Sequence, residues 1–325
     1  MKAVVYKRYG SPKELGVAEL GYPSINEDQL LIAVRGAAIN PYDWHLLRGT
    51  PYLVRIQSGL FKPKEGRFGS DFAGVVEAVG KSVSNFKVGD EVFGCGKGAV
   101  SQMALFTERQ LALKPRNLDF VEAAAVPMAG LTALQALRDK AKVQAGQKAL
   151  IVGASGGVGT FAVQIAKAFG AYVTGVCSAK NVQLVKDLGA ERVIDYTSED
   201  FSKGNEKFDV IIQTAGTHSV RALRRVLSPT GTLVVVGISQ EPKGNLGLGY
   251  ISRLLTSAVM SKMTKQTFAP LLTRISQTDL VALSELIESG SVKPVLDCIY
   301  PMGKVSTAVS ELERGHTRGK IVISI

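Results

Sequence analysis

The sequence predicts an α/β protein in which an antiparallel β-barrel is joined to a doubly wound parallel sheet. A glycine-rich stretch at 153–159 lies between an apolar β-branched run and a segment with helical periodicity. After this stretch strands and helices alternate, which is typical of a parallel sheet covered by helices. Before it, short strands are separated by Gly, Pro and Asp turns, which is typical of an antiparallel fold. The 325 residues suffice for two domains with separate cores.

The first half of the chain contains the strands of the predicted barrel, at 2–6, 29–38, 75–79 and 91–94. They are separated by turn sequences such as Gly10-Ser11-Pro12, Gly80-Lys81-Ser82 and Val88-Gly89-Asp90. The tail, 320–325, is one more apolar strand, and we expect it to return to this half. We therefore predict a barrel domain of residues 1–121 and 270–325, and a parallel-sheet domain of residues 122–269.

The second half begins with Lys148 to Val152, which has the composition of a buried parallel strand. A helix follows from Thr160 to Phe169, and a second strand lies at 172–176. Further strands are predicted at 192–195, 208–213 and 232–236, with a helix at 220–227. In such sheets the ligand crevice lies at the carboxyl ends of the strands.

The glycine-rich loop has the pattern A-x-G-x-x-G, with Ala154 in place of the first glycine of the usual dinucleotide fingerprint. Small residues let backbone N–H groups approach a pyrophosphate at the helix N-terminus, where unpaired donors and the helix dipole favour an anion. A purely structural turn is the alternative, but the strand before the loop and the helix after it favour a cofactor. The predicted contacts are Ala154, Ser155, Gly156, Gly157, Val158 and Gly159.

The end of the second predicted strand indicates which cofactor binds. An Asp or Glu is found about 20 residues after the glycines when the ribose hydroxyls of NAD are bound. This chain has Cys177 there, followed by Ser178 and, two residues later, Lys180. A hydroxyl and an ammonium can bind a 2′-phosphate that a carboxylate would repel, so the sequence predicts NADPH. A solvated lysine at a helix start is the alternative.

Composition limits the class of protein. The three cysteines, Cys95, Cys177 and Cys298, have no paired spacing, so neither a disulfide framework nor a cysteine-rich zinc site is expected. The N-terminus begins as a strand, and no run approaches the roughly 18 apolar residues of a membrane span. These features predict a cytoplasmic protein.

The net charge of +11 is mostly dispersed and lacks an aromatic-interleaved basic tract, so nucleic-acid binding is not expected. Residues 242–278 are the exception, because they contain no acidic residue and combine basic with apolar side chains. A domain-closing helix with basic residues facing solvent explains this segment, and weak contact with a membrane surface or an acidic partner remains open.

Several landmarks together resemble the medium-chain dehydrogenase/reductase superfamily over essentially the whole chain. They are residues 69–80 (GSDFAGVVEAVG), 88–92 (VGDEV), 124–133 (AAVPMAGLTA) and 318–322 (RGKIV). The resemblance implies a GroES-like catalytic domain and a Rossmann domain. Residues 37–44 (AAINPYDW) and 315–320 (GHTRGK) are most similar to the quinone oxidoreductase branch, with its chloroplast-envelope and reticulon-interacting members. Resemblance to this family also implies a homodimer.

The main departure from the superfamily pattern is at the positions of the zinc ligands. Alcohol dehydrogenases bind zinc with a Cys at the position of Asn40 and a His-Glu pair at the positions of Ser70 and Asp71. Asn and Ser cannot supply the N/S ligands of a tetrahedral catalytic zinc. The sequence therefore predicts an enzyme with no metal.

Without a metal, the expected reaction is hydride transfer to a quinone or an α,β-unsaturated carbonyl, whose phenolate or enolate oxygen carries the developing charge. Asn40 is the first candidate to stabilise that oxygen, and a turn-forming Asn before Pro41 is its alternative. Tyr52, in the loop after Gly49, is the second candidate, and simple packing is its alternative. Resemblance to the family implies further cofactor contacts at Thr132, Tyr196, Gly237, Ile238, Arg318, Gly319 and Lys320.

Two features of the sequence point to rival classes of protein. Tyr300 and Lys304 have the Y-x-x-x-K spacing of short-chain dehydrogenases, but Pro301 and Gly303 make a helix there unfavourable and the β-rich first half has no counterpart in that class. The non-enzymatic rival is an NADPH-binding sensor or membrane-associated partner that uses residues 242–278. The fingerprint and the phosphate-binding residues favour catalysis.

Overall fold

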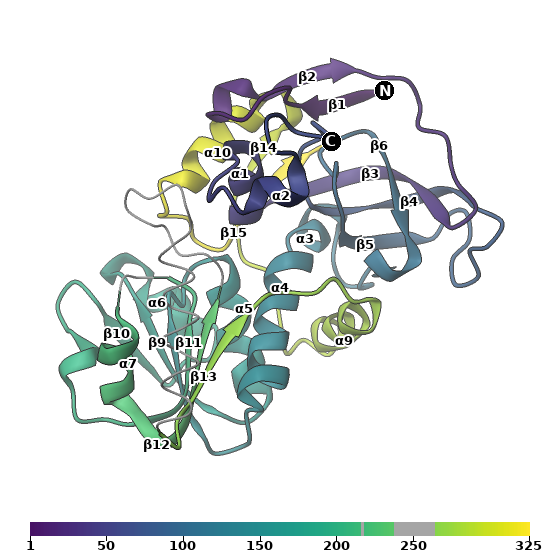
Figure 1. Ribbon diagram of the computed structural model, residues 1–325. Helices are drawn as coiled ribbons and strands as arrows, with labels where there is room; N and C mark the ends of the chain where they lie inside the picture. Colours follow the sequence, from purple (N-terminus) through teal and green to yellow (C-terminus); the bar gives the residue numbers. More distant parts are fainter. Residues whose placement is uncertain (216–217, 237–263) are drawn as a thin grey trace. The chain divides into compact units, whose positions relative to one another are not determined.

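The computed structural model describes residues 1–215, 218–236 and 264–325 (Figure 1). These residues form two compact units. Unit 1 comprises residues 1–131, 275–290 and 294–325, and unit 2 comprises residues 132–274 and 291–293. The predicted Gly237 and Ile238 contacts, and the basic segment up to residue 263, lie outside the described residues.

Unit 1 is built on a seven-stranded sheet with the order β14-β15-β3-β4-β5-β7, and β6 pairs with β3. All neighbouring strands are antiparallel except β14 and β15. The strands are β3 (Gln29–Ile39), β4 (Asp71–Val79), β5 (Glu91–Cys95), β6 (Met103–Thr107), β7 (Leu111–Leu113), β14 (Leu296–Pro301) and β15 (Lys320–Ser324). A separate hairpin joins β1 (Lys2–Val5) to β2 (Gly16–Glu19).

The helices of unit 1 are α1 (Pro41–Arg48), α2 (Val54–Ser58), α3 (Phe120–Ala124), α9 (Gln277–Glu288) and α10 (Val305–Glu313), with short 3₁₀ turns η1 (Pro12–Glu14), η2 (Glu108–Gln110) and η6 (Met302–Lys304). The sequence placed the domain boundaries at 121/122 and 269/270, whereas the units divide at 131/132 and 274/275. One reason is that α3 packs against β3 and β4 and so belongs with the barrel.

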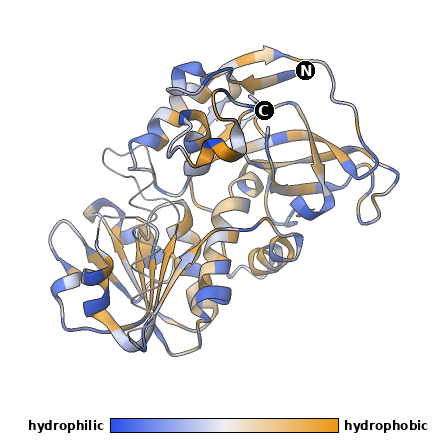
Figure 2. Cartoon of the chain, viewed as in Figure 1, coloured by the Kyte–Doolittle hydropathy of each residue, from blue (hydrophilic) through white to orange (hydrophobic). Residues whose placement is uncertain are grey.

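The core of unit 1 is apolar and aromatic. Phe72 and Phe106 stack with their ring centroids 3.8 Å apart, and both are fully buried. Apolar residues concentrate along the strands (Figure 2). The chain's tail, β15, pairs antiparallel with β3, so that Ile321 lies opposite Ile39. The predicted return of the tail to the first domain is confirmed, and it brings Lys320 next to the end of β3.

Unit 2 is a six-stranded parallel sheet with the order β10-β9-β8-β11-β12-β13. Its strands are β8 (Lys148–Val152), β9 (Tyr172–Cys177), β10 (Arg192–Asp195), β11 (Phe208–Gln213), β12 (Leu227–Val236) and β13 (Thr267–Leu271). The predicted bounds of β8, β10 and β11 agree with the structure. The doubly wound prediction is confirmed by the parallel pairing and by β8 at the centre of the sheet.

The helices of unit 2 are α5 (Gly157–Ala168), α6 (Val182–Asp187) and α7 (Val220–Val226), with 3₁₀ turns η4 (Ala179–Asn181) and η5 (Phe201–Lys203). Helix α4 (Pro127–Leu134) continues into a π-helix, η3 (Gln135–Ala141).

Two buried glutamines fix segments where the chain leaves unit 2. Gln135 exchanges two hydrogen bonds with the backbone of Arg274, and Gln164 does the same with Lys293. No helix within 1–215, 218–236 or 264–325 is long and apolar enough to cross a membrane.

Candidate active site and cofactor loop

The glycine-rich loop ends at the N-terminus of α5, as the sequence predicts. Gly156 is the N-cap residue in an extended conformation, and no side chain caps the first turn. The backbone N–H groups of Gly157, Val158 and Gly159 precede the first intrahelical donor, Thr160, which bonds to the Gly156 carbonyl at 2.9 Å. A helix end with uncapped donors and a positive dipole is suited to a phosphate.

Two glycines of this loop are required by geometry. Gly153 has φ +86°, a left-handed conformation that favours glycine. At Gly159 an added Cβ would lie 2.0 Å from the Gly153 carbonyl oxygen, so a side chain cannot be accommodated without moving the backbone. At Gly156 an added Cβ would meet only that oxygen, at 3.5 Å. Close packing between loop and helix therefore explains Gly159, whereas the space beside Gly156 is open.

The second predicted contact region lies where β9 and β10 end. Cys177 pairs with Asp195 in the parallel register, and the Tyr196 N–H donates to the Cys177 carbonyl at 3.0 Å. Ser178 follows Cys177 directly, and Lys180 is exposed. The sequence-predicted residues Ser178, Lys180 and Tyr196 are thus gathered at the carboxyl end of these strands.

A residue that the sequence did not single out connects this region to the glycine-rich loop. The Asn181 amide donates to the Ser155 hydroxyl at 3.0 Å and to the Ser178 hydroxyl at 3.3 Å. Asn181 is 4% exposed, and its Oδ1 has no partner among the described residues. One side chain therefore joins the predicted pyrophosphate loop to the predicted 2′-phosphate loop.

Asp195 adds a negative charge to the same end of the sheet. Its carboxylate accepts from the backbone N–H and the hydroxyl of Thr197, at 3.0 and 2.8 Å, and these bonds hold its pKa below the usual range. Burial, together with the Asp195 charge, raises the pKa of the Cys177 thiol to about 11. Cys177 is consequently a neutral thiol near pH 7.

In unit 1, the side chains that the sequence compares with zinc ligands form one buried polar cluster. The Asn40 amide donates to Asp71 Oδ2 at 2.8 Å and to Ser70 Oγ at 3.2 Å. The Lys320 ammonium donates to Asn40 Oδ1, and its Nζ lies 3.3 Å from Asp71 Oδ2. All four residues are less than 5% exposed. We call Asn40, Asp43, Ser70, Asp71 and Lys320 the Asn40 cluster.

Local structure explains how the cluster is assembled. Asn40 is the N-cap of α1, and Pro41 occupies the first turn, where its missing N–H costs nothing. Asp43 accepts from the Asn40 backbone N–H at 2.7 Å, forming a capping box. Asp71 is the first residue of β4, Ser70 directly precedes it, and Lys320 begins β15. The turn interpretation of Asn40 and its placement in a polar site are therefore compatible.

The charges of the cluster are unequal, because two carboxylates share one ammonium. Burial, and then the Asp71 charge, raise the pKa of Asp43 to about 7. Burial also raises the pKa of Asp71, against the Lys320 ammonium and the Asn40 amide. Burial and the two carboxylates raise the pKa of the Cys95 thiol well above its ordinary value. The Asp71–Lys320 ion pair is thus accompanied by an acid that titrates near neutral pH.

These residues do not fit a tetrahedral zinc site. Zinc requires deprotonated thiolates, imidazoles or carboxylates. The cluster instead offers an amide, a hydroxyl, the Asp71 carboxylate paired with Lys320, and the Asp43 carboxyl, which caps α1; the neighbouring Cys95 is a neutral thiol. The Lys320 ammonium contacts two of the three side chains that would have to serve as ligands. Within the described parts of the chain, no three His, Cys, Asp or Glu side chains are grouped to hold a metal ion.

Tyr52 and Thr132, two further predicted site residues, each contact other side chains of the protein. The Tyr52 ring is 41% exposed, and the Arg55 guanidinium lies 4.7 Å from its centroid and 4.6 Å from that of Tyr9. The Thr132 hydroxyl lies 2.8 Å from that of Thr273 in unit 2. Packing of Tyr52 is therefore observed, and its role toward a substrate stays a prediction.

The tail residues lie beside β14. The Arg318 N–H donates to Asp297 at 3.1 Å, and Gly319 has φ +79°. A Cβ at Gly319 would lie 2.1 Å from the Val295 carbonyl oxygen. Arg318 and Gly319 stay predicted cofactor contacts, whereas the ammonium of Lys320 is directed into the Asn40 cluster.

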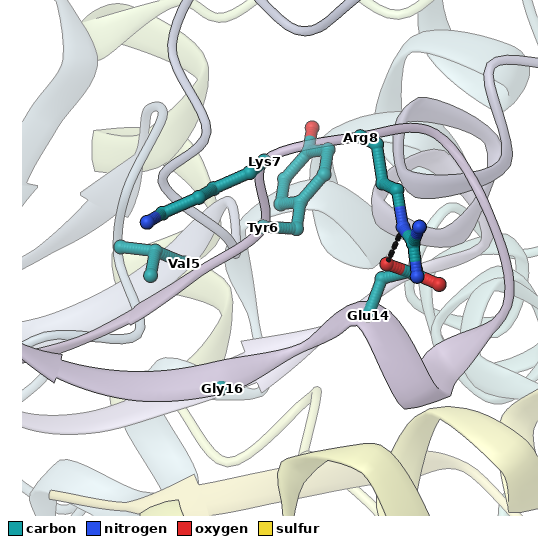
Figure 3. Close-up of a pocket in the computed structure, with 6 residues that line it drawn as sticks. All are labelled: Val5, Tyr6, Lys7, Arg8, Glu14 and Gly16. Carbon is teal, nitrogen blue, oxygen red and sulfur yellow. Dashed lines mark hydrogen bonds and ion pairs between the residues drawn. The ribbon is translucent and has the colours of Figure 1, made fainter.

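Two other features lie apart from these sites. A shallow pocket on the β1–β2 hairpin is lined by Val5, Tyr6, Lys7, Arg8, Glu14 and Gly16, with Arg8 and Glu14 paired across it at 2.5 Å (Figure 3). None of the predicted site residues lies in it.

Tyr300 lies in β14 and Lys304 in η6, so the pair does not share a helical face and the short-chain motif is absent there.

Comparison with known families identifies the class of protein. Residues 26–116 match the alcohol dehydrogenase GroES-like domain, and residues 188–323 match the zinc-binding dehydrogenase family. Together with relatives that are more than 30% identical over nearly the whole chain, among them a chloroplast envelope quinone oxidoreductase homolog of Arabidopsis thaliana, these matches show that the chain belongs to the medium-chain dehydrogenase/reductase superfamily, in its quinone oxidoreductase branch.

Individual relatives cover nearly the whole chain. The mitochondrial NAD(P)H oxidoreductase RTN4IP1 of Bos taurus is 33% identical over 100% of this chain and 89% of its own length. The 2-methylene-furan-3-one reductase of Solanum lycopersicum is 36% identical over 99% of this chain and 79% of its own length. The quinone oxidoreductase structure from Coxiella burnetii is 30% identical, with a TM-score of 0.87 over 100% of this chain and 99% of that one.

Proposed function

We propose that the protein is a metal-independent, NADPH-dependent reductase of quinones or α,β-unsaturated carbonyls. The observation that carries the metal-independent part is the Lys320 ammonium, which hydrogen-bonds to Asn40 and Asp71 at the position that the resemblance assigns to zinc. The reductase part is supported by the branch, whose similar members are a quinone oxidoreductase and a 2-methylene-furan-3-one reductase.

NADPH would be held by unit 2. The uncapped N-terminus of α5 suits the pyrophosphate, and Ser178, Lys180 and Tyr196 suit the 2′-phosphate. When bound, NADPH supplies the hydride. Cys177 leaves the end of β9 without the carboxylate that would select NAD.

A conjugated acceptor suits a site without a metal. Hydride addition to its carbon places negative charge on a distant oxygen, where a few hydrogen-bond donors suffice. One such donor contributes roughly 2.7–4 kcal/mol to the transition state in enzymes from which a donor has been removed. We assign this task first to Asn40 and second to Tyr52.

The hydrogen bonds of Asn40 set a condition on this role. Both amide hydrogens are used, one by Asp71 at 2.8 Å and one by Ser70 at 3.2 Å. To donate to an acceptor oxygen, Asn40 would have to release the longer bond, to Ser70. The charge-assisted bond to Asp71 would remain and keep the amide in place.

The test is NADPH oxidation with a quinone, a short enone and a long-chain enone. We expect turnover with at least one of them and slower single turnover when the transferred hydrogen is deuterium. Asn40→Ala should lower kcat by about 100-fold while NADPH binds with nearly unchanged affinity. Tight NADPH binding with no turnover on any acceptor would favour the sensor alternative, and turnover of simple alcohols alone would exclude this mechanism.

A further inference from the structure

The ammonium of Lys320 is fully engaged inside the protein. Its Nζ lies 3.3 Å from the Ile39 carbonyl oxygen, within hydrogen-bond distance of Asn40 Oδ1, and 3.3 Å from Asp71 Oδ2. An ammonium group has three N–H donors, and the structure supplies three oxygen acceptors for them. The side chain is 4% exposed, so solvent contributes little to its stabilisation.

Removing this cation would leave an uncompensated charge. Asp71 is fully buried, and its other oxygen accepts the Met128 backbone N–H at 3.1 Å. The neutral Cys95 thiol also hydrogen-bonds to Asp71, but neither of these groups carries a positive charge. Asp43, 2% exposed, adds a second acidic group. Lys320 is the only cation that hydrogen-bonds to this cluster in the described residues. An unpaired buried carboxylate is strongly destabilising, whereas removal of both partners of a pair is often tolerated.

The two charges also determine how the Asn40 amide is oriented. Lys320 donates to Oδ1, and Asp71 accepts from Nδ2. If the amide turned over, its N–H groups would face an ammonium and its oxygen would face a carboxylate. Both contacts would be repulsive. Opposite charges on its two sides therefore favour one orientation more strongly than uncharged hydrogen-bonding groups would.

We propose that Lys320 is the fixed cation of the Asn40 cluster and a positioning residue, which holds the Asn40 amide in its working orientation together with Asp71. Its effect on turnover rests on the proposed function, but its effect on stability does not. In this role the ammonium touches neither substrate nor cofactor, because its three donors are used by Ile39, Asn40 and Asp71. This differs from the cofactor contact that the family resemblance implies for Lys320.

The experiment compares Lys320→Met, the double variant Lys320→Met/Asp71→Asn, and Lys304→Met as the matched control at an exposed lysine of the same unit. Lys320→Met should lower Tm by on the order of 10 °C, or fail to fold, because Asp71 loses its partner. The double variant should recover most of this loss, because neither charge remains unpaired. Lys304→Met should have the Tm of the unmodified protein.

Turnover of the folded double variant separates positioning from simple structural support. With neither charge present, the orientation of the Asn40 amide is held less firmly, so kcat should fall by on the order of tenfold while the NADPH Kd changes by less than about twofold. A double variant with unmodified kcat would overturn the positioning role. A Lys320→Met variant as stable as the Lys304→Met control would overturn the fixed cation. If the unmodified protein turns over none of the acceptors, the proposed function fails, and the Tm measurements still test the cation.

Discussion

The glycine-rich loop of unit 2 and the Asn40 cluster of unit 1 differ in whether their hydrogen-bond donors have partners within the protein. At the start of α5, three backbone donors have no side-chain cap. In the Asn40 cluster, the amide of Asn40 and the ammonium of Lys320 use all their donors within the protein. One region leaves backbone donors without a side-chain cap, and the other uses its donors to hold its own side chains.

The difference follows from burial and charge. Backbone N–H groups at a helix end can stay exposed to water until a phosphate replaces it, at little cost to folding. A buried ammonium or carboxylate cannot stay unpaired, because its desolvation costs several kcal/mol in real proteins. Changes at the loop should therefore affect binding more than stability, and changes in the cluster should affect stability and its pH dependence.

The largest effect is expected from Gly156→Asp. Gly156 has ordinary dihedral angles for an N-cap, φ −82° and ψ 176°, and a Cβ there is not blocked. Asp is a favourable N-cap that would satisfy the donors of α5, so the stability should rise by about a few tenths of a kcal/mol. The same carboxylate would repel the pyrophosphate and weaken NADPH binding by on the order of 100-fold.

Gly156→Ser is the matched control for this change, because it caps the helix without adding a charge. Its effect on NADPH binding should be clearly smaller. The measurements are the NADPH Kd by fluorescence titration and Tm by calorimetry. Unchanged NADPH binding in Gly156→Asp would mean that the start of α5 does not hold the pyrophosphate.

Asp43→Asn tests the charge balance of the cluster. The pKa of Asp43 is raised from 3.8 to about 7 in the folded protein, so the folded state binds the proton more tightly than the unfolded state does. This group therefore favours folding fully at low pH, and its contribution is lost as pH rises between about 4 and 7. Asparagine lacks this loss of stability, so Asp43→Asn should become more stable relative to the unmodified protein as pH rises, by on the order of 4 kcal/mol across that range.

Tm measured over the same pH range for both proteins gives the comparison. The absolute effect of Asp43→Asn also includes the weaker acceptor that it offers to the Asn40 N–H, so the pH-dependent part is the informative quantity. A Tm difference that stays constant with pH would show that Asp43 is not the titrating group.

The elements that could be predicted from the sequence are those whose formation depends on residues close together in the chain. β8, β10 and β11 were predicted with their observed bounds, because a buried parallel strand is a short apolar run that ends at glycine or polar residues. The position of the glycine-rich loop was predicted for the same reason, because strand, glycines and helix are consecutive. Helix α9 and strand β13 were not predicted, because their patterns lie beside or within the basic segment and carry no equally clear turn signal.

The Asn40 cluster shows where such prediction stops. Asn40, Ser70 and Asp71 could be selected from the sequence by their positions. Their partner Lys320 lies 280 residues from Asn40 and 249 from Asp71, and only the pairing of β15 with β3 brings it there. Asn181 was missed although it is close to Ser178, because a buried amide between two hydroxyls has no sequence signature. Local spacing predicts loops, whereas buried polar networks depend on strand pairing.

A smaller effect on affinity is expected at the end of β9. Lys180→Ala should weaken NADPH binding by about tenfold, since a charge-assisted bond to the 2′-phosphate is lost, and it should leave NADH binding unchanged. Asp195→Asn should instead strengthen NADPH binding, because it removes a negative charge from the same strand ends. Titration of each protein with both cofactors gives the ratio of affinities. Equal affinities of the unmodified protein for NADPH and NADH would contradict the assignment.

The smallest effect is expected from chelation, which should leave turnover unchanged. A zinc ion at the Asn40 cluster would have to displace the Lys320 ammonium from Asn40 and Asp71 and would find no thiolate or imidazole among Asn40, Ser70 and Asp71. Activity before and after exhaustive dialysis against a strong chelator, with the zinc content of the purified protein measured alongside, tests this. Stoichiometric zinc that is lost together with activity would show that the cluster rearranges around a metal. The Asn40 cluster would then not use all its hydrogen-bonding groups within the protein, and the contrast with the uncapped loop would be wrong.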